Sequence, residues 1–430
     1  MKILSVTAGA AGMYCGSCLR DNAFATEMMA RGHEVTLLPL YTPTNPDEPN
    51  VSRRRVLFGG ISIYLQQHIA LFRMTPRFLD RLWDSPAVIS AFASRSISTD
   101  PKLLGDLTIS MLEGERGVLR KEFDKLLEWL ADEPVPDVVN LPNSLLIGLA
   151  APIRRALRRP VCCTLQGEEL FLDGLIEPYR TKAMELIRAQ VPDVDRFIAV
   201  SEWYAPMMSR LLTIPAAKMS VVPLGINTNG YERRRADDGV FRVGYFARIS
   251  PEKGLLNLAK AYALLRRRTG SAPMRLEAAG FMSPAHESYL DEVKQTLDAA
   301  GVAGEFTYHG AVDRTRKIDF LRSLSVLSVP TPYDEPKGVF LLEAMATGVP
   351  VVQPRRGSFT EVVQNTGGGI LVAPDDPQAL ADGLHEMWSD PGRRHALGAA
   401  AFDGVRRHYA IQRAADIQLN VYESLATAVR

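Results

Sequence analysis

Short apolar runs alternate with helical segments along the first half of the chain. The runs are five to seven residues long and carry few charges. Buried strands of a parallel sheet have continuous apolar sequences because helices cover both of their faces. The pattern therefore predicts a first domain with parallel strands at residues 2–8, 34–39, 135–141, 161–165 and 196–200.

The same alternation restarts after residues 221–227 and predicts a second set of strands at 241–246, 274–280, 305–309, 326–330 and 350–354. We therefore predict an α/β fold with two doubly wound, Rossmann-like domains, residues 1–223 and 224–413. Open α/β sheets bind ligands beyond the carboxyl ends of their strands. Two such domains are expected to face a central cleft.

The stretch from about residue 51 to residue 133 is too long for a simple connection. It contains helical patterns, so we expect an ordered insertion on the first domain. An insertion at that place would lie over one side of the cleft, where its aromatic side chains would shape the choice of ligand. Aromatic residues at helical spacing are more often buried, so local core packing is the preferred interpretation of Tyr64, His68, Phe72 and Trp83.

Composition narrows the class of protein. The chain has 430 residues, a formal net charge of +1 and 46% hydrophobic residues, which is typical of a soluble globular protein and not of a nucleic-acid binder. No apolar run reaches the length of a membrane span, and residues 1–12 are better interpreted as a first buried strand than as a signal peptide. We expect a cytoplasmic protein. Basic clusters allow peripheral contact with anionic lipid at the inner face of the membrane, at residues 154–159, 233–235 and 266–268.

Residues 333–350 place two carboxylates on either side of a helix start that follows a glycine. Gly338 lets the backbone approach a ligand closely, and the first amides of the helix, including those of Gly338 and Val339, favour an anion. An ionised carboxylate only accepts hydrogen bonds, so Glu335 and Glu343 would bind neutral hydroxyls beside that anion. The alternative is a surface helix with ordinary glutamates.

Seven residues separate Glu335 from Glu343, and this spacing resembles the two-glutamate motif of the family-4 glycosyltransferases. The resemblance continues along the chain in the family's order. Residues 1–6 and 31–35 resemble the family's opening strand-helix-strand, and residues 221–227 resemble the crossover between its two domains. Residues 243–254 resemble its donor-phosphate loop. It is weakest between about residues 50 and 134. The resemblance implies a GT-B-type pair of domains, with a last helix at about 414–430 that packs back on the first domain.

The resemblance also implies hexosyl transfer with retention of anomeric configuration. A nucleoside diphosphate leaves with rising negative charge, which Arg248 and Lys253 would neutralise from a loop between strand and helix. We therefore expect no metal requirement and no cofactor beyond a nucleotide-diphosphate sugar as donor. The acidic pair Asp193 and Asp195 is better interpreted as a turn between a helix and a strand than as a metal site.

Further donor-binding roles follow from the resemblance. Glu335 would bind the donor sugar and Glu343 the ribose. Gly12 would border the donor from the glycine-rich loop at residues 9–16, and backbone groups near Val312 would contact the base. A UDP-sugar is favoured because uridine is frequent in the family. The acceptor stays open between a saccharide, a lipid-linked precursor and a small molecule.

One position departs from the family pattern. Many relatives carry a histidine facing the donor sugar where this chain has Gln166. A glutamine can bind a sugar hydroxyl but does not titrate near neutral pH, so proton transfer is not assigned to it. Glu168 is predicted to be an accessible alternative base or acceptor-binding group. No protein nucleophile is required if a phosphate oxygen of the leaving group takes the acceptor proton.

Two rival functions remain open at this point. Cys15 and Cys18 follow a predicted strand and open a helix, as in thioredoxin-like redox sites, while Cys162 and Cys163 stand on a predicted strand. A tight turn packed with small residues is the preferred interpretation of the first pair, because a redox function leaves the patterns at Glu335 to Glu343 and Arg248 to Lys253 unexplained. The other rival is a nucleotide-sugar-binding regulator without transfer activity.

Ser358 and Glu361 have the spacing of a capping box. In that motif the hydroxyl and the carboxylate each accept a hydrogen bond from a backbone amide at the start of a helix. We therefore expect both side chains to cap a helix.

Overall fold

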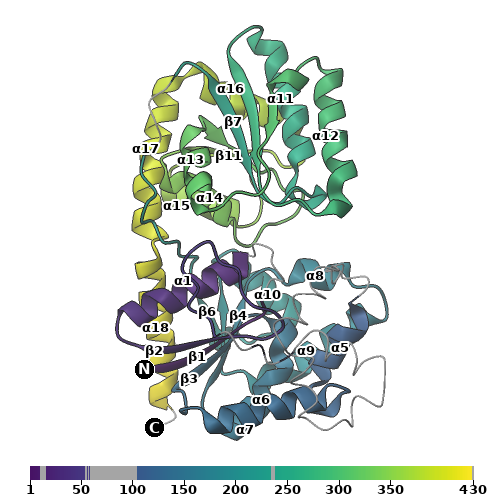
Figure 1. Cartoon of the computed structure of the whole chain (residues 1–430), viewed down its shortest axis with the longest axis vertical. Helices are drawn as coiled ribbons and strands as arrows, with labels where there is room; N and C mark the ends of the chain where they lie inside the picture. Colours follow the sequence, from purple (N-terminus) through teal and green to yellow (C-terminus); the bar gives the residue numbers. More distant parts are fainter. Residues whose placement is uncertain (10–15, 54–55, 57, 59–103, 234–237, 429–430) are drawn as a thin grey trace. The chain divides into compact units, whose positions relative to one another are not determined.

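Figure 1 shows the computed structural model, which describes residues 1–9, 16–53, 56, 58, 104–233 and 238–428. The chain divides into two compact units, one formed by Met1–Pro223 with Ala414–Arg430 and the other by Leu224–Arg413. Some residues of the sequence analysis lie outside the described residues, namely Gly12, Cys15, Tyr64, His68, Phe72 and Trp83.

The first unit is built on a parallel sheet with the strand order β2-β1-β3-β4-β5-β6. β1 pairs with both β2 and β3, so the strand order reverses beside β1. All residues of β4 are buried, as expected for a central strand covered on both faces. The strands are β1 (Lys2–Thr7), β2 (Glu34–Pro39), β3 (Val138–Leu141), β4 (Val161–Leu165), β5 (Arg196–Ala199) and β6 (Met219–Val221).

Helices from both ends of the sequence meet on this unit. The C-terminal helix α18 (Ile411–Ala428) crosses α1 (Gly16–Ala30), and the buried guanidinium of Arg20 donates to Gln418 Oε1 at 3.2 Å (Figure 1). The other helices are α5 (Gly105–Glu113), α6 (Arg120–Asp132), α7 (Ala150–Leu157), α8 (Glu169–Gly174), α9 (Tyr179–Gln190) and α10 (Tyr204–Leu212). Across the described part of the chain, no helix is long and apolar enough to span a bilayer.

The second unit repeats the plan with the strand order β12-β11-β10-β7-β8-β9. The chain runs outward from β7 to β9 and then returns to form β10 on the other side of β7, so these two central strands are a topological switch point. The strands are β7 (Phe241–Phe246), β8 (Met274–Ala279), β9 (Phe306–Tyr308), β10 (Val326–Leu327), β11 (Val351–Pro354) and β12 (Gly369–Val372). The predicted α/β class with two doubly wound sheets is confirmed.

Helices cover both faces of the second sheet, with α11 and α12 on one side and α13, α14 and α15 on the other (Figure 1). They connect successive parallel strands, as crossovers in doubly wound folds do. The helices are α11 (Leu255–Thr269), α12 (Glu287–Ala299), α13 (Arg314–Ser323), α14 (Val339–Ala346), α15 (Ser358–Thr366), α16 (Pro377–Ser389) and α17 (Pro391–His408).

Two strands were not predicted, and several predicted strands are shorter than expected, β3 and β10 by three residues each. β6 is a half-buried edge strand without an apolar run, and β12 follows a glycine run that indicates a loop. β10 ends at Leu327, before the turn in which the Thr331 amide donates to the Val329 carbonyl. Pro330 in that turn lacks an amide hydrogen and therefore cannot continue the ladder as a donor.

Gly254 joins β7 to α11 at a point where no larger residue fits. Its φ is +77°, and a Cβ atom there would lie 2.0 Å from the Pro330 carbonyl oxygen. We expect Gly254→Ala to lower the free energy of unfolding by at least about 3 kcal/mol, from backbone strain and steric overlap together. Urea unfolding measures this loss.

Gly301→Ala is the matched control, because Gly301 has a φ of +72° and a Cβ there would meet no atom within 4 Å. Its cost is therefore backbone strain alone, about 1–2 kcal/mol. Equal losses for the two variants would contradict the close packing of the Gly254 turn against Pro330.

Candidate functional site

The candidate site lies at the carboxyl ends of β7 and β10. After β7, the chain passes through a short 3₁₀ turn at Pro251–Lys253 into α11, and after β10 it passes through residues 331–338 into α14. Both loops leave the same edge of a parallel sheet from neighbouring strands. The topology therefore brings together residues that are distant in sequence, and two helix N-termini with them.

Lys253 and Glu335 meet across these two loops. The Lys253 Nζ atom lies 2.5 Å from Glu335 Oε2, and the Tyr333 hydroxyl donates to the same oxygen at 2.5 Å. Lys253 Nζ also lies 2.6 Å from the Tyr333 hydroxyl. The side chains of Lys253 and Glu335 are only 12% and 4% exposed. The predicted phosphate-binding cation and the predicted sugar-binding carboxylate thus form one buried ion pair.

The environment of Glu335 keeps its carboxylate ionised. Burial alone would raise its pKa, but the charge and hydrogen bond of Lys253, with the Tyr333 hydroxyl, lower the pKa to about 2. The other oxygen, Oε1, is 3.3 Å from the Lys337 amide and 3.5 Å from the Gly338 amide, which makes these contacts weak. The carboxylate is therefore a negatively charged acceptor at neutral pH.

The backbone of Glu335 is fixed by the segment that begins α15. The Ser358 amide and hydroxyl both donate to the Glu335 carbonyl at 2.9 Å. A Cβ atom on Gly357 would lie 2.5 Å from the same carbonyl oxygen. The prediction that Ser358 is the capping residue of α15 is wrong, because Gly357 takes that position and Ser358 is the first residue of the helix. The hydroxyl instead holds the loop that carries Glu335.

Gly338 begins α14 in a left-handed conformation, with a φ of +67°. Few residues other than glycine adopt this conformation without strain. The Val339 amide, in the first turn, makes no hydrogen bond within the described part of the chain. The N-terminus of α14 thus presents an amide beside Glu335, as the sequence predicted.

Glu343 lies in α14 and is buried, with its side chain 9% exposed. Its Oε1 atom accepts hydrogen bonds from Lys317 Nζ at 2.6 Å and from the Tyr231 hydroxyl at 3.1 Å. Sequence analysis missed both partners. Lys317 lies in a charged helical segment, and nothing in that segment distinguishes it from a solvent-exposed lysine.

Arg248 lies apart from the Lys253 and Glu335 pair. Its guanidinium is about half exposed and reaches Glu252 Oε1 at 3.3 Å. Its carbonyl accepts a hydrogen bond from the buried Tyr245 hydroxyl at 2.8 Å. The backbone at this position is therefore anchored, while the one contact of the long side chain with a described residue is exposed.

Val312 directly precedes Asp313, whose side chain caps α13 through the Arg316 amide. Val312 is half-buried, and neither its amide nor its carbonyl is hydrogen-bonded to the rest of the described chain. Its backbone groups are therefore available to a ligand.

In the first unit, Gln166 and Glu168 both lie at the end of β4. Glu168 Oε1 accepts from the amide and hydroxyl of Ser144, each at 2.9 Å, and Oε2 accepts from the Gln166 amide at 2.8 Å. The prediction that Glu168 is accessible is wrong, since its hydrogen bonds tie two loops together in the core. Gln166 is also buried, and its Nε2 donates to the Pro142 carbonyl at 2.8 Å. Its Oε1 has no hydrogen-bond partner among the described residues.

The described cysteines lack the surroundings of reactive thiols. Burial raises the pKa of both Cys162 and Cys163. Cys18 is buried in α1, with its Sγ atom 3.9 Å from the Thr7 hydroxyl. Reactive cysteines need a lowered pKa and access to their substrate. These positions therefore give the thiol redox alternative no support.

The acidic pair of the sequence analysis lies where a helical turn ends and β5 begins, as predicted. Asp195 Oδ2 accepts from the Val161 amide at 2.8 Å, and Oδ1 pairs with Arg154 at 3.0 Å. Asp193 ends the turn. The described residues contain no group of three or more potential metal-ligating side chains.

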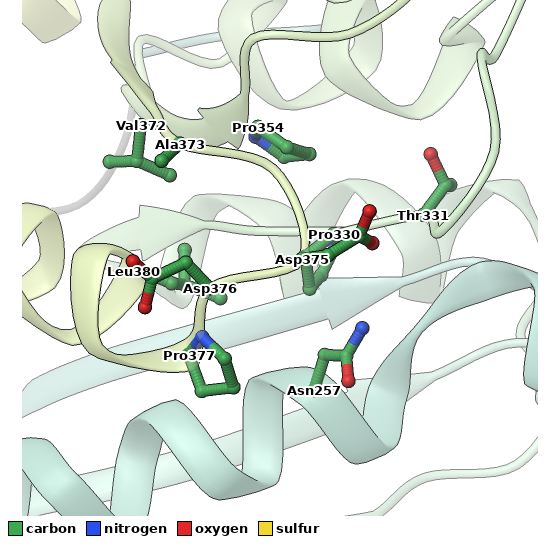
Figure 2. A pocket seen from close by; sticks show the side chains of 10 residues that line it. All are labelled: Asn257, Pro330, Thr331, Pro354, Val372, Ala373, Asp375, Asp376, Pro377 and Leu380. Atoms are coloured by element: carbon green, nitrogen blue, oxygen red, sulfur yellow. The ribbon is translucent and has the colours of Figure 1, made fainter.

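A pocket lies beside the Glu335 loop, between α11 and the turns that follow β10, β11 and β12 (Figure 2). Its acidic residues already have partners. Asp376 caps α16, and Asp375 forms an ion pair with Arg356, which also reaches the Thr331 carbonyl at 3.5 Å and Asp334 at 3.7 Å. Arg356 thus joins the pocket rim to the loop that carries Glu335, and we assign the pocket a supporting role.

The lowered pKa of Glu335 predicts a specific acid sensitivity. Because its folded-state pKa is about 2 and its ordinary value is 4.5, the ionised carboxylate stabilises the fold above about pH 4.5, and this contribution is lost as the pH falls towards 2. Relative to Glu335→Gln, the wild-type protein should lose about 2–3 kcal/mol of unfolding free energy between pH 6 and pH 2. Urea unfolding of both proteins across that range measures it. A difference independent of pH would show that Lys253 does not stabilise the ionised form.

Comparisons with known proteins agree with this geometry. A family model described as "Glycosyltransferase Family 4" matches residues 110–229, and one described as "Glycosyl transferases group 1" matches residues 232–403. A D-inositol 3-phosphate glycosyltransferase from Arthrobacter sp. (strain FB24) is 31% identical over 215 residues, 48% of this chain and 50% of the relative. The lipopolysaccharide core biosynthesis mannosyltransferase LpsB from Rhizobium meliloti is 34% identical over 188 residues, 43% of this chain and 51% of the relative.

The chain thus spans about half the length of these curated relatives. Among solved structures, HepE from Anabaena in complex with UDP has a TM-score of 0.68 and 17% identity, and the match covers 99% of this chain and 100% of that one. At this identity the likeness concerns the fold, which is GT-B. The two family models match segments in both units of the structure. On these grounds, the chain belongs to the family-4 glycosyltransferases.

Proposed function

We propose that this protein transfers a sugar from a nucleotide-diphosphate sugar to an acceptor hydroxyl, with retention of anomeric configuration and without a metal ion. The observation that carries the proposal is the buried pair of Lys253 and Glu335 beside two helix N-termini. A sugar nucleotide presents a diphosphate next to neutral hydroxyls. The site offers a cation and backbone amides to the diphosphate, and an ionised carboxylate to the hydroxyls.

Lys253 stabilises the departing diphosphate. The glycosidic bond from the anomeric carbon to the diphosphate oxygen breaks, and negative charge grows on the phosphate oxygens. A cation in a site largely shielded from water stabilises that charge more than the smaller charge of the bound donor. Arg248 can leave its exposed contact with Glu252 and add a second positive charge.

Glu335 binds a donor-sugar hydroxyl and does not act as the base. A carboxylate with a pKa of about 2 is a weak base at neutral pH. In the proposed reaction, the acceptor oxygen bonds to the anomeric carbon on the face from which the diphosphate leaves, and a phosphate oxygen takes the acceptor proton. The products are the glycosylated acceptor and the nucleoside diphosphate, and no covalent enzyme intermediate forms.

The nucleotide would lie along α13 and α14, with its ribose at Glu343 and its base near the backbone of Val312. UDP is the favoured nucleotide, and the binding of UDP by HepE, which has the same fold, supports this choice. The acceptor class stays a saccharide, a lipid-linked precursor or a small molecule, in line with the inositol phosphate and lipopolysaccharide named for the relatives.

Lys253→Met is expected to lower kcat about 100-fold or more, with a smaller change in the donor KM, because the lost interaction grows with leaving-group charge. Transfer from a radiolabelled donor measures both constants. Donors identified by a thermal-shift panel of UDP-, GDP- and ADP-sugars are used. Lys260→Met is the control, since Lys260 is exposed on α11 and makes no hydrogen bond or ion pair in the described structure.

Lys253→Met leaves the buried Glu335 carboxylate without its cation, which can destabilise the fold. The double variant Lys253→Met/Glu335→Gln removes that charge as well, so it separates a loss of folding from a loss of catalysis. Wild-type kcat in a folded Lys253→Met variant would remove Lys253 from the mechanism. Donor binding without nucleotide release for any acceptor would favour the regulator alternative.

Metal independence and stereochemistry are tested together in one reaction. With excess EDTA the rate should be unchanged, and proton NMR of the product should show the anomeric configuration of the donor. Loss of activity that Mg²⁺ or Mn²⁺ restores would overturn metal independence. An inverted product would require a different position of the acceptor relative to the diphosphate.

A further inference from the structure

We propose that Lys317 and Tyr231 are positioning residues that orient Glu343 and thereby set a preference for ribose over deoxyribose in the nucleotide. The inference rests on the proposed function, because it concerns the nucleoside half of the donor. It adds two residues to the site and assigns them a measurable selectivity.

The hydrogen bonds around Glu343 converge on one oxygen. Lys317 Nζ and the Tyr231 hydroxyl both donate to Oε1, at 2.6 Å and 3.1 Å. A carboxylate offers about two acceptor directions on each oxygen. The two donors therefore fill Oε1 and fix the plane of the carboxylate, while Oε2 accepts nothing from the described residues. Oε2 is left to accept hydrogen bonds from a ligand.

The burial of this pair also points to a role beyond stability. The side chains of Lys317 and Glu343 are 5% and 9% exposed. Removing two charges from water costs about as much as their attraction returns, so well-packed apolar residues would stabilise the same position equally well. A buried ion pair does provide a carboxylate held in a single orientation. That property is useful when the carboxylate must meet a ligand hydroxyl.

Tyr231 is itself held firmly in place. Its backbone carbonyl accepts from the Arg406 guanidinium at 2.7 Å, and the Arg314 guanidinium lies 5.2 Å from the centre of its ring. Arg314 also donates to the Asn229 carbonyl at 3.0 Å, which ties the loop before Tyr231 to α13. The Tyr231 hydroxyl therefore has little freedom to turn away from Glu343.

The start of α13 then serves two parts of the nucleoside. Val312, whose backbone groups are available, directly precedes the helix, and Lys317 lies one turn into it. One element would therefore position both the base contact and the ribose contact.

The selectivity follows from the chemistry of the ribose diol. A fixed carboxylate oxygen accepts from a ribose hydroxyl, and a deoxy nucleotide loses that charge-assisted hydrogen bond. We therefore expect the wild-type protein to bind the ribose form about ten-fold or more tightly than the 2′-deoxy or the 3′-deoxy form. If Lys317 or Tyr231 is removed, the carboxylate loses its orientation, and this ratio should fall.

Isothermal titration calorimetry with UDP or GDP, whichever binds the wild-type protein, and with its 2′-deoxy and 3′-deoxy forms tests the proposal. We expect the ratio of dissociation constants to fall to within about two-fold in Lys317→Met and by at least about three-fold in Tyr231→Phe. Lys260→Met is the charge-matched control and should keep the wild-type ratio. Tyr231→Phe removes only a hydroxyl, so it remains a valid test if Lys317→Met does not fold.

Each other outcome overturns the proposal. If both variants bind the ribose and deoxy forms more weakly by the same factor, Lys317 and Tyr231 act only on stability, and the inference is wrong while the proposed function stands. If the wild-type protein binds ribose and deoxy forms equally, Glu343 does not contact the diol. If it binds no nucleoside diphosphate, the proposed function and this inference fall together.

Discussion

The candidate site depends on one constraint, which is that the ionised Glu335 must be paired inside the protein. A buried carboxylate is costly unless a cation and hydrogen bonds compensate it. Lys253 and Tyr333 supply that compensation from two loops that the sheet topology places side by side. Much of the local structure serves to keep this meeting point fixed, including the Gly254 turn behind Lys253 and the Ser358 contacts behind Glu335.

The two glutamates of the motif share this arrangement. Glu335 is paired with Lys253 from the segment after β7, and Glu343 with Lys317 from the helix before β10. Each carboxylate also accepts from a tyrosine hydroxyl. Helix α14 and the loop before it thus carry two carboxylates that are individually neutralised by elements from different parts of the second unit. This permits two acceptor groups to stand near a phosphate site without strong mutual repulsion.

Much of the fold was predictable because buried parallel strands leave a strong apolar pattern. β6 and β12 escaped prediction because an exposed edge or a run of glycines weakens that pattern. Glu335, Glu343 and Lys253 were found from local spacing. The partners of Glu343, which are Lys317 and Tyr231, could not be found that way, because a contact between α13 and α14 depends on how the strands are ordered in the sheet.

Errors in the site predictions have the same origin. Glu168 follows a strand and has polar neighbours in sequence, which suggests access to solvent, yet its partners Ser144 and the Gln166 amide come from two loops that close over it. Ser358 has the spacing of a helix cap, but its hydroxyl donates to the Glu335 carbonyl of a distant loop and Gly357 occupies the capping position. In both cases a long-range hydrogen bond takes the place of the local one that the sequence indicates.

The mutual neutralisation of Lys253 and Glu335 has a consequence for ligand binding under the proposed function. Inorganic phosphate or a free nucleoside diphosphate that draws Lys253 away leaves a buried carboxylate without its cation and offers it no sugar hydroxyl in return. A free sugar supplies hydroxyls but does not engage the lysine. Only a molecule that carries both groups at the correct separation replaces all the interactions that it breaks. The pair therefore favours ligands that carry a diphosphate and a sugar together, and it disfavours the binding of abundant cellular anions and free sugars.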